Sequence, residues 1–272
     1  MERITEQQSL HRNLEHKSID ELIFAINGED KKVALAIEKV LPQVSTLISA
    51  IVTKIECGGR LFYIGAGSGG RLSVLDVIEL PTTYGIPKGI VNVVLAGGVK
   101  NLADALEEKE DDRTAGWTEL KTQNINQKDL VIGISASGTT PFVLETLKTC
   151  KAHGITTGCI VSNPASPIAK ESNFPIEVIT GPEFITGSTR MKCGTAQKML
   201  FDMISTTIMI RLGRVEDNNM VHVALINDKI TDRAVKMLMK TTNIDNYDQA
   251  KVLLLEFGSV KKAKDSIKLK SR

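Results

Sequence analysis

The pattern of apolar and polar positions changes twice along the chain and divides it into three parts. In residues 1–50, apolar side chains recur three or four positions apart, which is typical of helices. From residue 51 to residue 214, short apolar runs alternate with helix-compatible segments. Past that point no strand is expected, and helices are predicted over 223–242, 246–258 and 259–270. The pattern predicts a helical N-terminal arm (1–50), an α/β domain (51–214) and a helical C-terminal tail (215–272).

Local signals place the helix ends in the N-terminal arm. Ser18 and Glu21 are spaced as in a capping box, which opens a helix. Asn27 and Gly28 are a common pair at helix ends, so this helix is expected to stop there and a second one to follow. Pro42 fits the first turn of a third helix. Three successive helices are therefore predicted before the first strand.

Five apolar runs in the middle part are candidate strands. The first four are each followed by a helix-compatible segment, such as 141–154, and a long helix is expected over 191–212. Runs that are apolar on both faces suit a parallel sheet covered on two sides. The predicted fold class is α/β, a five-stranded parallel sheet flanked by helices. The strands are expected at 60–64, 90–95, 130–134, 156–161 and 176–179.

Composition and charge narrow the class of protein. A formal net charge of +2 argues against a dedicated nucleic-acid binder, and the basic segment 260–272 is interpreted as a solvated helix face or a frayed end. No apolar run approaches the roughly 18 residues of a membrane span, and the first ten residues lack the apolar core of a signal peptide. The four cysteines show no C-x-x-C spacing. We expect no nucleic-acid or membrane partner, and a cytoplasmic protein with reduced thiols.

A glycine-rich loop follows the first candidate strand. Gly65, Gly67 and Gly70 spell G-x-G-x-x-G, the dinucleotide fingerprint. A dinucleotide site also needs an acidic residue at the end of the second strand, where this chain has Leu95-Ala96-Gly97-Gly98. No G-K-[ST] follows either, so the loop is not a Walker A sequence. Backbone N–H groups at a helix start favour another phosphate instead.

A hydroxyl-rich loop follows the third candidate strand. Ser135, Ser137, Thr139 and Thr140 surround Gly138 ahead of a helix that begins with proline. One such hydroxyl would be interpreted as an ordinary helix cap. Four of them around one glycine favour a site that holds the phosphate of a phosphosugar without a metal.

Longer segments carry a resemblance to a known family. "YIGAGSGGR" and "ISASGTTP" resemble the SIS (sugar isomerase) domain, a five-stranded parallel sheet that binds phosphosugars. "GAGSGGRLSVLDVIELPTTYG", "ALEEKEDD", "GSTRMKCGTAQK" and "INGEDKKVALAIEKVLP" are together similar to the N-acetylmuramic acid 6-phosphate etherase family, over nearly the whole chain. That family cleaves the lactyl ether of N-acetylmuramic acid 6-phosphate to N-acetylglucosamine 6-phosphate and D-lactate, during recycling of cell-wall sugars. The resemblance implies a homodimer with no metal or other cofactor.

The resemblance also implies two catalytic glutamates, Glu79 and Glu110. Glu79 stands among apolar neighbours ahead of Pro81, which fits either a buried carboxyl group with a raised pKa or an exposed glutamate near a helix end. Glu110 belongs to an acidic run of the kind that is usually solvated, and only the resemblance selects it. By analogy Glu79 is the acid that protonates the departing lactate, and Glu110 is a base that acts on substrate or water.

The remaining candidate residues lie in three segments. The family commonly has G-A-G-T-S-G-R, whereas this chain has a serine and a glycine in place of T-S, which removes one hydroxyl but no backbone N–H. In "GPEFITGSTRMK", residues near a helix start are candidates for the substrate pocket, although the charged ones would also suit an ordinary surface. The predicted substrate-binding residues are Gly67, Ser68, Gly69, Ser135, Ser137, Gly138, Thr139, Thr140, Glu183, Ser188, Thr189 and Lys192, with Arg190 as a further candidate.

A protein of another class also fits part of this pattern. SIS domains occur in proteins that bind phosphosugars without catalysis and regulate a partner, including a glucokinase regulator that resembles these etherases. A sugar-sensing transcription regulator is less favoured, because the N-terminal arm shows no convincing helix-turn-helix. The two glutamates and the single SIS unit favour the enzyme.

Overall fold

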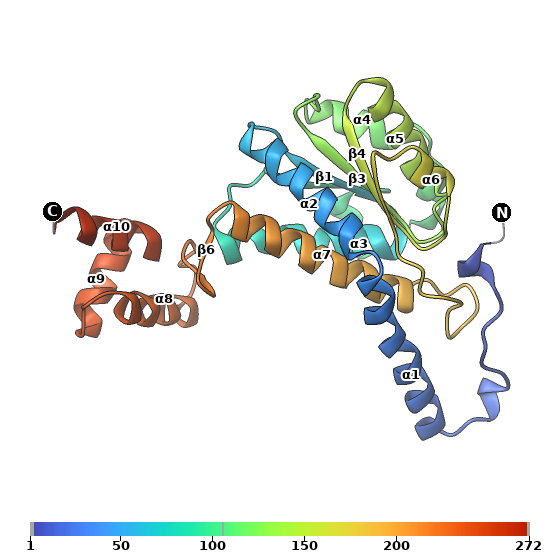
Figure 1. Ribbon diagram of the computed structural model, residues 1–272, viewed down its shortest axis with the longest axis horizontal. Coiled ribbons are helices and arrows are strands. Elements are labelled where there is room, and N and C mark those ends of the chain that lie inside the picture. Colours follow the sequence, from blue (N-terminus) through green and yellow to red (C-terminus); the bar gives the residue numbers. More distant parts are fainter. Residues whose placement is uncertain (1–2, 105, 271–272) are drawn as a thin grey trace. The chain divides into compact units, whose positions relative to one another are not determined.

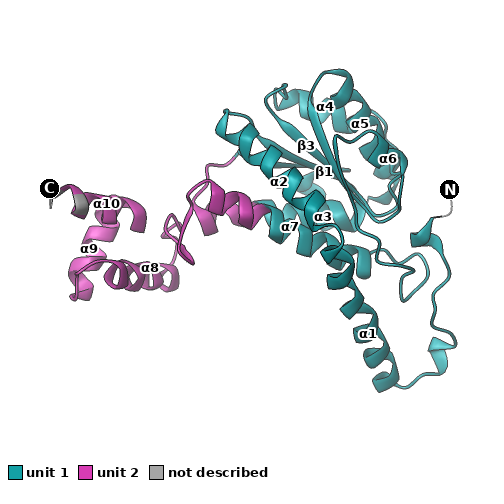
Figure 2. Cartoon of the chain, viewed as in Figure 1, with its two compact units in different colours: residues 1–77, 89–204 teal, residues 78–88, 205–272 magenta. Residues whose placement is uncertain are grey.

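Two compact units make up the chain. The computed structural model describes residues 3–104 and 106–270, so the last two residues of the basic segment 260–272 lie outside the described residues. Unit 1 comprises residues 1–77 and 89–204, and unit 2 comprises residues 78–88 and 205–272 (Figure 2). The expected division at residues 50 and 214 stays a prediction.

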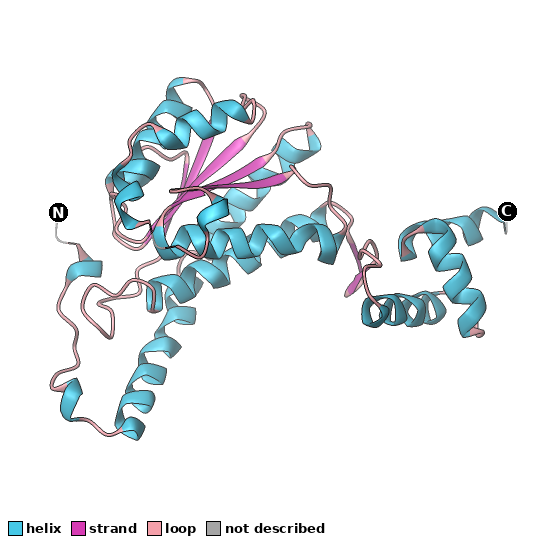
Figure 3. Ribbon diagram, turned by 180° about the vertical axis from the view of Figure 1, so that it is seen from behind, coloured by secondary structure: helices cyan, strands magenta, loops and turns pink. Residues whose placement is uncertain are grey.

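Unit 1 is built on the predicted five-stranded parallel sheet. The strands stand in the order β2-β1-β3-β4-β5 and are all parallel. Figure 3 shows the sheet with helices packed around it. The fold class is thereby confirmed, and four strands lie within one residue of their predicted bounds. Their ranges are Leu61–Gly65 (β1), Val91–Leu95 (β2), Leu130–Ser135 (β3), Thr156–Val161 (β4) and Phe174–Glu177 (β5).

The fifth strand begins two residues earlier than expected. β5 contains Pro175, and proline has no N–H to donate to a neighbouring strand. β5 is an edge strand, so only one of its sides needs to pair. The side chain of Asn173 accepts a hydrogen bond from the backbone N–H of Thr157 at 2.9 Å and fixes where the pairing starts.

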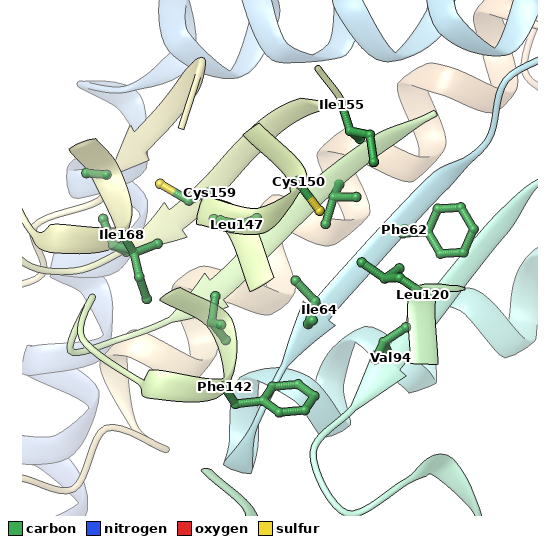
Figure 4. Close-up of a cluster of buried hydrophobic side chains, with 14 residues drawn as sticks. Phe62, Ile64, Val94, Leu120, Phe142, Leu147, Cys150, Ile155, Cys159 and Ile168 are labelled. Carbon is green, nitrogen blue, oxygen red and sulfur yellow. The ribbon is translucent and has the colours of Figure 1, made fainter. Parts of the chain in front are cut away.

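Helices cover both faces of the sheet. On one face lie α4 (Ala115–Thr122), α5 (Pro141–Ala152) and α6 (Pro167–Lys170), which share a buried core with the strands (Figure 4). α2 (Leu41–Glu56) and α7 (Lys192–Arg211) lie on the other face (Figure 1). Alternate residues of a strand point to opposite faces. Phe62 accordingly belongs to the first core, whereas Tyr63 packs its ring on Phe201 of α7 at 5.2 Å.

The N-terminal arm holds one long helix where two were expected. It contains the short turns η1 (Ile4–Glu6) and η2 (Leu14–His16), then α1 (Ile19–Glu38). The capping box is confirmed, with the Glu21 N–H donating to Ser18 Oγ at 3.3 Å. The predicted break at Asn27–Gly28 is wrong, because α1 runs straight through it.

No single helix in the described ranges is long and apolar enough to cross a bilayer, and α1 and α2 reach that length and apolar character only as a pair bent by 60°.

Unit 2 contains the three helices predicted for the tail. They are α8 (Asp228–Thr241), α9 (Tyr247–Phe257) and α10 (Val260–Lys270), and they enclose a second apolar core. The expectation of no strand is wrong, because β6 (Val215–Glu216) and β7 (Asn219–Met220) form a two-stranded antiparallel hairpin. Strands of two residues are too short for a periodic pattern to reveal.

Candidate functional site

A cavity of about 180 Å³ opens in unit 1 where β1 and β3 end. In the observed strand order, β1 and β3 are neighbours, and the chain leaves them toward opposite edges of the sheet. Open parallel sheets bind ligands at this kind of switch point, outside the carboxyl ends of the strands. The cavity is lined by Glu6, Ala66, Gly67, Ser68, Gly69, Glu110, Ile134, Ser135, Ala136, Ser137, Thr140, Gly187, Thr189 and Gln197.

The glycine loop forms one wall of the cavity. Gly67 begins α3 (Gly67–Tyr84) with a φ of +52°, a left-handed conformation that favours glycine. At Gly70 an added Cβ would lie 2.6 Å from a Leu95 side-chain carbon and 2.8 Å from the Gly65 carbonyl carbon. The glycines thus serve the tight turn and the close packing of helix on strand. The start of α3 lies at the cavity, where its N–H groups and dipole favour an anion.

The hydroxyl loop forms the facing wall. Ser135 Oγ lies 3.2 Å from Ser137 Oγ and 2.8 Å from Thr140 Oγ1, and all three residues line the cavity. The predicted cluster is therefore brought together at the end of β3. Thr139 does not line the cavity, and its hydroxyl donates to Ser137 Oγ at 3.1 Å. Gly138 is also outside the lining, and it is held at a φ of +70° against the Ser166 side chain.

The N-terminal arm is tied to the hydroxyl loop through one asparagine. Asn163 lies just after β4 and is fully buried. Its Nδ2 donates to Thr5 Oγ1 at 2.9 Å and to the Ser137 carbonyl at 3.0 Å, while its Oδ1 accepts from the Thr5 N–H at 3.2 Å. This link brings the next residue, Glu6, to the cavity.

Glu110 reaches the cavity from the short helix η4 (Glu107–Asp111). Its carboxyl lies against the glycine loop, since a Cβ on Gly67 would be 2.8 Å from Glu110 Oε1. Burial raises the pKa of Glu110 to about 7, helped by a hydrogen bond with Glu107 and the nearby charge of Asp111, while Arg71 lowers it. A carboxyl group with such a pKa exchanges protons near neutral pH, as a general acid or base must.

Glu79 is not among the residues that line this cavity. It belongs to the last turns of α3, in unit 2, and its side chain is exposed. Of the two alternatives that its apolar neighbours left open, the structure shows the exposed glutamate: Leu80 is buried, but Ile78 is exposed like Glu79 itself. Its assignment to catalysis stays a prediction.

Two of the predicted substrate-binding residues have other partners inside the chain. Glu183 is buried, and its two carboxylate oxygens accept the N–H groups of Lys192 and Cys193 at 2.9 Å each. It therefore caps the first turn of α7. Lys192 is 2% exposed, and its Nζ donates to Glu29 Oε2 of α1 at 2.6 Å. Neither side chain lines the cavity.

The segment between them contributes less to the cavity than expected. Thr189 lines it, but Ser188 does not, and Arg190 is exposed outside the lining. Sequence reasoning missed Glu6, Gly187 and Gln197, which do line it. For Gln197 a signal was present, because a lone carboxamide interrupts the apolar face of a helix. No local signal marks Glu6 or Gly187.

The lining residues offer hydroxyls, backbone N–H groups, one carboxamide and two carboxyl groups. In the described ranges, no three His, Cys, Asp or Glu side chains are placed together to hold a metal ion. The arrangement offers N–H and O–H donors to an anion and a carboxyl group at Glu110 that can move a proton. It suits proton-transfer chemistry on a phosphosugar.

Family comparisons agree with this reading of the fold. A family model described as "SIS domain" matches residues 117–206, and one described as "Glucokinase regulatory protein N-terminal SIS domain" matches residues 43–151. The phosphoheptose isomerase of Neisseria gonorrhoeae superposes with a TM-score of 0.54 at 16% identity, over 70% of this chain and 98% of that one. At this identity the likeness shows the fold alone.

Full-length relatives are much more similar. The N-acetylmuramic acid 6-phosphate etherase of Bacteroides fragilis is 51% identical over 98% of this chain and 94% of its own length. The protein of the same name from Porphyromonas gingivalis is 52% identical over 99% of this chain and 98% of its own length. The match includes the N-terminal arm and the helical tail as well as the sheet.

Proposed function

The chain belongs to the N-acetylmuramic acid 6-phosphate etherase family, and from this premise we propose that it cleaves the lactyl ether of that sugar with Glu110 and Glu79 as its catalytic carboxyl groups. The products are N-acetylglucosamine 6-phosphate and D-lactate. The enzyme is a lyase, because the carbon–oxygen bond breaks by elimination before water adds.

Each step of this reaction moves a proton. In the ring-opened sugar, carbon 3 carries the lactyl ether and lies beta to the aldehyde. A base takes the proton from carbon 2, and the resulting enolate expels the ether oxygen, which an acid protonates to give lactate. Water then adds at carbon 3 of the unsaturated aldehyde, and carbon 2 regains a proton. A carboxyl group that titrates near neutral pH can both accept and donate a proton in these steps.

One observation carries the proposal: Glu110, with its pKa raised to about 7, shares a cavity with the hydroxyl cluster. The cluster of Ser135, Ser137 and Thr140 supports binding of the 6-phosphate, and the start of α3 adds N–H groups on the opposite wall. Glu110 is then the base. Glu79 as the acid rests on the family resemblance.

The regulator alternative is not favoured. A model of a regulator's SIS domain matches only residues 43–151, whereas the etherases match nearly the whole chain at about half identity.

The decisive experiment compares two conservative variants. Glu79→Gln and Glu110→Gln keep size and polarity but remove the transferable proton, so lactate release should fall about a hundred- to ten-thousand-fold while sugar binding persists. Glu79→Gln should retain exchange of the carbon 2 proton with deuterium, followed by NMR, because the base is intact. Glu110→Gln should lose it.

The matched control is Glu108→Gln. Glu108 is an exposed member of the same acidic run and does not line the cavity, so its variant should release lactate at the wild-type rate. If both Glu79→Gln and Glu110→Gln release lactate at the wild-type rate, the catalytic assignment is overturned. If the wild type itself releases no lactate, the non-catalytic regulator becomes the favoured function.

We also propose a homodimer whose second subunit completes the site. The substrate carries a phosphate and a carboxylate, yet the described lining of the cavity has two carboxyl groups and no Lys, Arg or His side chain. A cation supplied by the second copy would balance these charges. Exposed apolar side chains on α1 support a contact between copies, and Ile19 and Phe24 are 78% and 76% exposed.

A cytoplasmic location is proposed as well. All four cysteines are free thiols, as is usual in a reducing compartment, and the substrate is a sugar phosphate. Cell fractionation followed by an assay of lactate release in each fraction tests it.

A further inference from the structure

A single glutamine of α7 stands out among the residues that line the cavity. Gln197 is 2% exposed and borders the cavity between the two phosphate-facing loops. Its side chain makes no hydrogen bond to any residue in the described part of the chain. The neighbouring buried polar groups of α7 differ in this respect, since Lys192 is paired with Glu29.

The position of Gln197 on its helix makes this unusual. Cys193 and Phe201, four residues before and after it, are both fully buried, so the residue lies on the apolar stripe that faces the sheet. Methionine or leucine would fill such a site without a polar group. A carboxamide that is 2% exposed and has no partner in the described part of the chain lowers stability unless water or a ligand in the cavity binds it.

The glycine loop leaves room for this side chain. A Cβ on Gly69 would lie 2.8 Å from Gln197 Oε1 and 2.8 Å from the Cγ2 atom of Ile134. The carboxamide therefore reaches as far as the backbone of the loop that opens α3. Its remaining exposure is toward the cavity, which it lines together with Gly69.

We propose that the Gln197 carboxamide binds the sugar part of the substrate, through a ring or chain hydroxyl, beside the loops that hold the phosphate. This inference rests on the proposed function for the identity of the sugar. A carboxamide offers an N–H donor and a C=O acceptor side by side, and a hydroxyl both donates and accepts. A phosphate dianion only accepts, so it would leave the carboxamide oxygen without a partner.

Calorimetric titration with two ligands tests the assignment. N-acetylglucosamine 6-phosphate contains both parts of the ligand, whereas inorganic phosphate contains only the anion. In Gln197→Met, which nearly preserves the volume, the dissociation constant for the sugar phosphate should rise about tenfold and that for inorganic phosphate should not change. Ser137→Ala, the matched comparison in the phosphate-facing cluster, should weaken both ligands.

Thermal unfolding of the ligand-free protein distinguishes a binding role of Gln197 from a purely structural one. Gln197→Met removes a buried polar group without a partner, so its Tm should equal or exceed that of the wild type. Equal weakening of both ligands, no weakening of either, or a lower Tm would overturn the inference.

Both ligands bind without turnover, so this test does not depend on catalysis. A wild type that binds the sugar phosphate but releases no lactate would defeat the proposed function and leave the role of Gln197 standing. If Gln197→Met binds the sugar phosphate more weakly but inorganic phosphate as before, and the wild type releases lactate, both the role of Gln197 and the proposed function are supported.

Discussion

The most informative single residue is Glu110, because its environment opposes ionisation. Burial and the neighbouring carboxyl groups raise its pKa to about 7, and Arg71 offsets only part of this. As the base of the reaction it must be ionised, so we expect kcat/KM to rise with pH through an ionisation near 7 in the wild type.

The same pKa makes a prediction about stability. The folded state holds the Glu110 proton up to about pH 7, whereas an unfolded chain releases it near 4.5. The contribution of Glu110 to stability is thus fully present below pH 4.5 and is lost as the pH rises through 7. As the pH rises through this range, Glu110→Gln should become more stable relative to the wild type, by on the order of 2 kcal/mol at pH 8 once solvent screening of this partly exposed group is allowed for.

Denaturant unfolding at pH 4, 6 and 8 measures this difference. Glu108→Gln, at an exposed position of the same short helix, should show no such dependence on pH. A constant difference between Glu110→Gln and the wild type at all three pH values would mean that Glu110 titrates normally.

At the scale of elements, a buried ion pair joins α1 to α7. Burial raises the pKa of Glu29, but hydrogen bonds from Lys192, Lys32 and His11 outweigh it and lower the pKa to about 2. The pair therefore contributes its stability above about pH 4.5 and loses it as the pH falls through 2. It also explains why α1 continues through Gly28, since a helix break there would displace Glu29.

Removing one partner of this pair should be costly. Glu29→Gln leaves the Lys192 ammonium, 2% exposed, without a carboxylate, and we expect a loss of about 3–5 kcal/mol in the free energy of unfolding at pH 7. Lys32→Met is the matched control. Lys32 binds the same carboxylate at 2.7 Å, but its side chain is 52% exposed, so its loss should cost no more than about 1 kcal/mol.

Urea denaturation at pH 7 compares the two variants. The double variant Glu29→Leu, Lys192→Met removes both charges and should recover part of the stability lost in Glu29→Gln. Equal effects of Glu29→Gln and Lys32→Met would show that burial does not govern the strength of this pair.

At the scale of the whole molecule, the proposed dimer is open to a direct test. Ile19, Ile23 and Phe24 form an exposed apolar surface on the first turns of α1. Light scattering of the wild type should give about twice the 29.6 kDa of one chain. Phe24→Asp places a charge in the proposed contact, so it should shift the mass toward a single chain and lower lactate release with it.

Val252→Asp is the control for this substitution. Val252 is an exposed apolar residue of α9 in unit 2, outside the proposed contact. A charge there should leave the mass unchanged. A wild type with the mass of one chain that still releases lactate would overturn the dimer and the shared site together.

Features that depend on residues close together in the sequence were predictable from the sequence. Four strands were predicted within one residue, and the capping box of Ser18 and Glu21 formed as expected. The hydroxyl cluster was also predictable, because Ser135, Ser137 and Thr140 stand within six residues where a parallel strand ends. The family resemblance rests on residues spread along the chain. It alone selected Glu110 from an acidic run that would otherwise be interpreted as solvent-exposed.

Only the tertiary structure decided the roles that arise between distant segments. Lys192 pairs with Glu29 across 163 positions, which keeps α1 unbroken and takes the lysine away from the cavity. Glu183 is used to cap α7, and Glu6 lies at the cavity because Asn163 binds Thr5. A burial pattern shows that a position is enclosed but not what it meets there. That depends on long-range contacts, whose free energy exceeds the local preference for a helix break or an exposed charge.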